Sequence, residues 1–80
     1  MKVEVLYFSQ VKDKVGKSSE IIDFDGITVE DLINYLITAY PDIKEILQKS
    51  MIAVNEHYAD KNTSLKENDK VAIIPPVSGG

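Results

Sequence analysis

TVEDLINYLITAY, residues 28–40, carries the most regular hydrophobic pattern in the chain. Its apolar residues recur at the three- and four-residue spacing of one helical face. Thr28 can cap the first turn, and Glu30 and Asp31 place negative charge where the helix dipole favours it. Pro41 should end or kink the helix at Tyr40. The segment predicts one main helix, and residues 42–49 are expected to add a further helical turn or two.

Runs of β-branched and aromatic residues on both sides of this helix predict strands. The expected strands cover residues 2–8, 19–24, 51–54 and 70–74, with a short strand around Tyr58. The first two lie close enough for a hairpin, and the polar residues 12–17 are expected to connect them. Asn55-Glu56 and residues 67–69 read as turns, where Asn68 tolerates a positive φ. The order predicts an α+β fold, with a mixed sheet of four to five strands wrapped around one main helix.

Composition narrows the possible functions. The 80 residues carry a net charge of −4 and contain no cysteine, which excludes disulfides, thiolate zinc sites and a cysteine nucleophile. The negative net charge makes a nucleic-acid partner unexpected, and the absence of a long apolar run makes a membrane partner unexpected. The single histidine, His57, has no co-ligands, so we expect no metal site and no permanently bound cofactor. These features indicate a cytoplasmic protein.

The end of the chain, residues 75–80, has an unusual composition. Two prolines stiffen the backbone, and two glycines then reduce it to bare main chain that could pass through a narrow channel. The sequence therefore predicts a folded domain over residues 1–74 and a flexible tail over residues 75–80. A frayed terminus is the alternative interpretation. The tail residues are Pro75, Pro76, Val77, Ser78, Gly79 and Gly80.

Strand alternation predicts an apolar patch beside this tail. Charged residues at positions 2, 4 and 70 mark the outer face of the first and last strands. Every second residue lies on the same face of a strand, so apolar residues later in both strands also face outward. Exposed apolar clusters usually mark protein interfaces. The alternative is a strand twist or bulge that buries Phe8. The expected interface residues are Leu6, Phe8, Tyr58 and Ile74.

Three segments resemble the MoaD/ThiS group of ubiquitin-like sulfur carriers, and most closely the small subunits of molybdopterin synthase. They are the opening strand VEVLYF, the tripeptide Ala53-Val54-Asn55 and the ending VAIIPPVSGG. The resemblance spans the whole chain and implies a ubiquitin-like β-grasp fold. Residues 68–69 read Asn-Asp where the family commonly has Gly-Asp, and asparagine fits the same turn.

The resemblance also implies a chemistry. A ubiquitin-activating-type adenylating enzyme would use ATP to adenylate the carboxylate of Gly80, and a sulfur donor protein would displace AMP to leave a thiocarboxylate. The tail would then enter the large subunit of molybdopterin synthase, in a heterotetramer, and donate sulfur to cyclic pyranopterin monophosphate for molybdenum cofactor biosynthesis. The chain would be no enzyme on its own, since the catalytic residues would lie on the large subunit.

Three other functions remain open from the sequence. The chain could carry sulfur for thiazole or amino-acid biosynthesis, although the Pro-Pro-Val-Ser ending argues against that role. It could be a ubiquitin-like modifier that is attached to lysines through Gly80. It could also be a non-reactive β-grasp binding module, in which case deletion of Gly80 would leave its function intact.

Overall fold

A five-stranded mixed sheet forms the framework of the computed structural model, which describes residues 1–77. The strand order across the sheet is β2-β1-β5-β3-β4. The central pair β1 and β5 is parallel, and all other neighbours are antiparallel. The expected hairpin between the first two strands is confirmed as the antiparallel pair β1 and β2. The strands are β1 (Lys2–Tyr7), β2 (Ser19–Asp23), β3 (Met51–Val54), β4 (His57–Ala59) and β5 (Lys70–Ile74).

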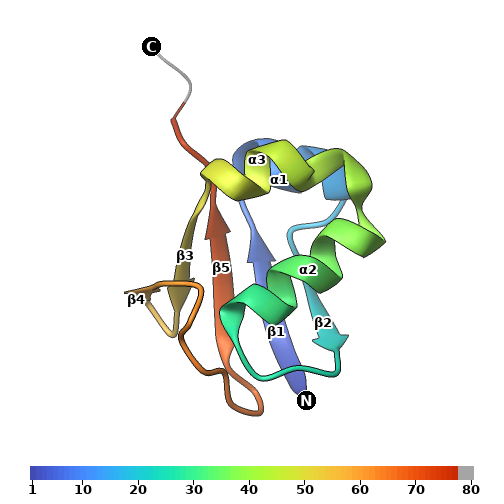
Figure 1. Cartoon of the computed structure of the whole chain (residues 1–80). Coiled ribbons are helices and arrows are strands. Elements are labelled where there is room, and N and C mark those ends of the chain that lie inside the picture. Colours follow the sequence, from blue (N-terminus) through green and yellow to red (C-terminus); the bar gives the residue numbers. More distant parts are fainter. Residues whose placement is uncertain (78–80) are drawn as a thin grey trace.

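Three α-helices and one short 3₁₀ helix accompany the sheet. The main helix α2 (Val29–Ala39) lies across one face of the sheet, as Figure 1 shows. Helices α1 (Ser9–Val15) and α3 (Lys44–Lys49) lie at the end of the sheet from which the chain leaves after β5 (Figure 1). The 3₁₀ helix η1 (Pro41–Ile43) joins α2 to α3, so the helical turns expected over residues 42–49 are confirmed.

The core lies between α2 and the inner face of the sheet. Alternate residues of β1 and β5 point inward, while Leu32 and Leu36 of α2 pack against them from the other side. The expected α+β arrangement is therefore confirmed. The buried inner-face residues of the two central strands are Val3, Val5, Tyr7, Val71 and Ile73.

The start of α2 has the cap that the sequence predicts. The Thr28 hydroxyl accepts a hydrogen bond from the Asp31 N–H, and the Asp31 carboxylate accepts one from the Thr28 N–H, which forms a capping box. The same carboxylate also accepts from the Ile27 N–H at 2.8 Å. These backbone hydrogen bonds, led by the one from Ile27, hold the pKa of Asp31 below its usual value.

Helix α1 corrects the expectation for residues 12–17. The sequence predicts a polar connection there, but residues 9–15 form a helix that ends at Gly16, whose φ is 88°. Val11 is fully buried and Val15, four residues later, packs on the core, so one face of this short segment has tertiary support. Lys12 and Lys14 in the last turn interact favourably with the helix dipole. A helix of seven residues depends on such packing, which its polar sequence does not reveal.

None of the helices in residues 1–77 is both long enough and apolar enough to cross a lipid bilayer.

Candidate functional site

The outer face of the sheet carries a groove beside the start of the tail. All four predicted interface residues line this groove: Leu6 from β1, Ile74 from β5, Tyr58 from β4, and Phe8 directly after β1. Phe8 is 46% exposed and Tyr58 is 73% exposed, whereas Leu6 and Ile74 are half-buried. The alternative in which a twist buries Phe8 is wrong. We call this surface, together with Ala53 and Ala72, the docking face.

Strand register explains why the docking face is hollow. Leu6 lies opposite Ala72, Ala72 opposite Ala53, and Ala53 opposite Tyr58, so one row of outward residues crosses four strands. The two alanines in the middle of the row have the smallest side chains, and larger apolar side chains stand at both ends. The result is a groove with a low floor between larger apolar side chains, a shape that fits a projecting side chain of a partner. Ser9, Asn55, Glu56 and Lys70 add polar groups to its lining.

The tail starts at one end of the docking face. Pro75 is buried, while Pro76 is exposed and Val77 is 92% exposed. Pro75 and Val77 both line the groove. Ser78, Gly79 and Gly80, which the sequence also assigns to the tail, lie outside the described residues. A partner that covers the groove would therefore contact the beginning of the tail at the same time.

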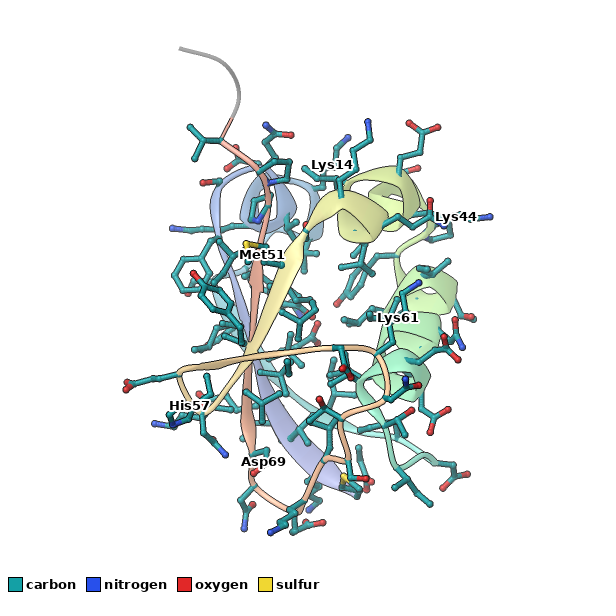
Figure 2. All side chains as sticks on the ribbon, turned by 60° about the vertical axis from the view of Figure 1, so that its left-hand side comes forward. Lys14, Lys44, Met51, His57, Lys61 and Asp69 are labelled. Atoms are coloured by element: carbon teal, nitrogen blue, oxygen red, sulfur yellow. The ribbon has the colours of Figure 1, made fainter. Side chains whose placement is uncertain are left out.

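Met51 is an exposed apolar residue next to the docking face that the sequence analysis missed, although it does not line the groove itself. It is 53% exposed and lies opposite Ile74 in the register between β3 and β5. Figure 2 places Met51 toward the end at which the tail leaves the sheet. Alternation could have found it, since Met51 is two residues before Ala53 on the same strand and therefore shares its face.

The turn between β3 and β4 is fastened to the beginning of β5. The Asn55 N–H donates to the Lys70 carbonyl at 2.8 Å, and the Lys70 N–H donates to Asn55 Oδ1 at 3.0 Å. Asn55 Nδ2 also donates to Asp69 Oδ1 at 2.9 Å. We call these three hydrogen bonds the Asn55 clasp. Asn55 and Glu56 have φ values of 50° and 72°. A two-residue type I′ turn in a β-hairpin requires positive φ at both residues.

A second polar cluster lies next to the end of β1, on the inner face of the sheet. Glu20 Oε2 accepts hydrogen bonds from Tyr7 at 2.5 Å and from Tyr40 at 2.7 Å, and Lys17 Nζ donates to Oε1 at 3.3 Å. Burial alone would raise the pKa of Glu20, but the three hydrogen bonds outweigh it and hold this pKa below its usual value. Burial and the bond to Glu20 raise the pKa of Tyr7. Such a satisfied cluster stabilises the end of β1 and faces away from the docking face.

The described residues offer no group of three or more histidine, cysteine, aspartate or glutamate side chains that could hold a metal ion. His57, the only histidine of the chain, is exposed at the start of β4.

The family model that matches this chain is that of the ThiS family, and it covers residues 5–80. The chain belongs to the ThiS family. The predicted resemblance to ubiquitin-like sulfur carriers is thereby confirmed. The match extends over the tail as well as over the sheet that carries the docking face.

Two named relatives are similar to this chain over all or nearly all of their length. The chain is 43% identical to the molybdopterin synthase sulfur carrier subunit of Dictyostelium discoideum, over 96% of this chain and 94% of the relative. It is 37% identical to the protein of that name in Chlamydomonas reinhardtii, over the full length of both.

Solved structures confirm the expected ubiquitin-like β-grasp fold. One is a chain of the protein–protein complex of subunits 1 and 2 of molybdopterin-converting factor from Helicobacter pylori, with 32% identity, a TM-score of 0.73 and full coverage of both chains. Another is the small archaeal modifier protein 1 from Methanosarcina acetivorans, with 25% identity, a TM-score of 0.86 and coverage of 99% of this chain and 96% of that one.

Proposed function

We propose that this chain is the sulfur carrier subunit of a molybdopterin synthase and carries sulfur as a thiocarboxylate on Gly80. The observation that carries the proposal is its similarity, over essentially the full length, to proteins named as such subunits. The family match continues through residue 80, so the similarity includes the residues that would do the chemistry.

The residues of the tail suit this chemistry. A carboxylate is a poor acyl donor, so an adenylating enzyme would use ATP to convert the Gly80 carboxylate to an acyl-adenylate with release of pyrophosphate. A sulfur donor protein would then displace AMP and leave the thiocarboxylate, which would donate its sulfur to cyclic pyranopterin monophosphate. The chain contains no cysteine, so sulfur cannot be carried on a side-chain thiol.

The docking face would hold each partner while the tail reaches the partner's active site. Phe8 and Tyr58 offer exposed aromatic surface, and residues of this kind dominate the binding energy of many protein interfaces. The adenylating enzyme and the large subunit must both accept the same tail, so we infer that both cover this face, one after the other. Leu6 and Ile74 would complete the contact. The similar chain from Helicobacter pylori is part of a protein–protein complex of subunits 1 and 2 of molybdopterin-converting factor.

The catalytic groups would belong to the partners. His57 is exposed on β4, and no cysteine is present for it to activate. The exposed tail residues Pro76 and Val77 carry no acid, base or nucleophile in their side chains. The tail would therefore supply the reacting carboxylate, and the partner enzymes would supply the groups that act on it.

Intact-mass spectrometry tests the proposal. The chain is incubated with the adenylating enzyme, ATP and a sulfur source, and then weighed. Replacement of one C-terminal oxygen by sulfur, lost again on addition of the large subunit and cyclic pyranopterin monophosphate, is the expected result. A matched variant that lacks Gly80 should remain unmodified. Wild-type protein of unchanged mass under conditions that modify an established sulfur carrier would contradict the proposal.

A protein-modifier function is the second candidate, because the solved small archaeal modifier protein is similar over almost the whole chain. It predicts an isopeptide bond between Gly80 and lysines of other proteins. Mass spectrometry of tryptic peptides from cell extract would show lysines that carry the C-terminal residues of this chain. If the thiocarboxylate forms but no such lysine is found, the carrier function alone is supported.

A further inference from the structure

Strand β4 is held differently from the rest of the docking face. It is the edge of the sheet, it has three residues, and none of them is buried. β1, β3 and β5 each have buried inward-facing residues, whereas β4 has only the partly buried Ala59 packed against the core, so hydrophobic burial holds β4 less firmly. Yet β4 contributes Tyr58, the most exposed aromatic side chain of the docking face.

The Asn55 clasp anchors β4 in addition to the partial burial of Ala59. It joins the turn that begins β4 to residues Asp69 and Lys70, at the start of a central strand. Asp69 is itself firmly placed, since its carbonyl accepts from the Glu4 N–H at 2.9 Å and its Oδ2 accepts from the Lys66 N–H at 2.8 Å. Figure 2 shows His57, the first residue of β4, at the same end of the molecule as Asp69.

We propose that Asn55 is a positioning residue for partner binding, because its clasp fixes the turn that leads into β4, the strand that holds Tyr58 over the docking face. The inference rests on the proposed function only in naming the partners that Tyr58 would contact. Asn55 meets two requirements at one position: it tolerates the positive φ of the turn, and its amide both accepts from Lys70 and donates to Asp69. Glycine would meet the first requirement alone, and aspartate would lose the donor.

A charge-neutral exchange gives the sharpest test. In the Asn55→Asp variant the carboxylate can still accept from the Lys70 N–H. It can no longer donate a hydrogen bond to the Asp69 carboxylate, and the two negative charges repel each other. In the double variant Asn55→Asp/Asp69→Asn the new amide at position 69 can donate back to position 55, and the net charge equals that of the wild type. Asn34→Asp on the exposed side of α2 is the matched control for the added charge.

Binding to the large subunit, measured by calorimetry, should weaken about tenfold in Asn55→Asp, since one bond is replaced by a repulsion. It should return to within about twofold of wild type in the double variant and stay unchanged in Asn34→Asp. For the adenylating enzyme the same variants should change KM and leave kcat within about twofold. Asn55→Gly, which keeps the turn and adds no charge, should weaken binding about three- to tenfold.

Nuclear magnetic resonance of the free protein gives a readout that requires no partner. The Tyr58 ring resonances should shift in Asn55→Asp and return in the double variant, while the Tyr7 ring resonances stay unchanged. Unshifted Tyr58 resonances overturn the inference even if no partner binds, and so does a double variant as impaired as the single one. A fall in kcat with unchanged KM also overturns it. Failure of the proposed function is distinguished by intact-mass spectrometry, in which the wild-type chain would then gain no sulfur.

Discussion

The two faces of the central strand pair use neighbouring residues for different purposes. On the inner face, Val71 and Ile73 of β5 are almost completely buried against α2. On the outer face, Ala72 and Ile74 of the same strand are only half-buried and line the docking groove. The inner residues therefore set the stability of the fold, whereas the outer residues are available to a partner. A shift of one position along a strand exchanges the two roles.

The adjacent isoleucines of β5 give the largest contrast. Ile73→Ala removes a fully buried side chain and should lower the free energy of unfolding by about 2–5 kcal/mol. Ile74→Ala removes a half-buried side chain and should cost about 1 kcal/mol. Urea denaturation followed by circular dichroism measures both values. Equal losses in the two variants would show that the two faces do not differ in this way.

Charged substitutions on the outer face should abolish partner binding and leave the fold intact. Phe8→Asp and Ile74→Asp place a carboxylate in the apolar groove, so affinity for the large subunit should fall about 30-fold or more. Ile21→Asp is the matched control, because Ile21 is 72% exposed on β2 and does not line the groove. Calorimetry gives the affinities. Unfolding of the Phe8 and Ile74 variants would instead assign these residues to the core.

The inner polar cluster should make stability depend on pH. The pKa of Glu20 is lowered in the folded protein, so the carboxylate stabilises the fold above its ordinary pKa of 4.5, and this contribution is lost as the pH falls through the lowered value. Glu20→Gln should cost about 1–2 kcal/mol at pH 7 and less at pH 3. Urea titrations at both pH values, with exposed Glu45→Gln as the control, measure the difference. A cost that is independent of pH would refute this explanation.

Tyr58→Ala should have the smallest effect on stability, and it separates binding from stability most cleanly. Tyr58 is 73% exposed, so its removal should change the free energy of unfolding by no more than about 0.5 kcal/mol. Affinity for the large subunit should fall by about 1–2 kcal/mol. If the affinity is unchanged, partners do not use the β4 end of the docking face.

Much of this arrangement could be predicted from the sequence because it depends on short-range patterns. The three- and four-residue spacing of apolar residues and the Thr28 N-cap predict α2. The alternation of residues along the strands predicts that Leu6, Phe8 and Ile74 face outward. Helix α1 could not be predicted from local patterns, because it is stabilised by Val11, which packs into a core that distant segments of the chain form. The Asn55 clasp could not be predicted from local patterns either. Its acceptor Asp69 is 14 residues away along the chain, and only the pairing of β3 with β5 brings the two together.

Sulfuration of the pterin by a chain extended beyond residue 80 shows whether the Gly80 carboxylate is the sulfur-carrying group. An uncleavable peptide added after Gly80 leaves the docking face unchanged and blocks the carboxylate on which the proposed chemistry depends. In a reconstituted assay with the adenylating enzyme, ATP, a sulfur source, the large subunit and cyclic pyranopterin monophosphate, the extended chain should bind its partners through the docking face but yield no sulfurated pterin. Formation of sulfurated pterin at the wild-type rate would show that the Gly80 carboxylate does not carry the sulfur.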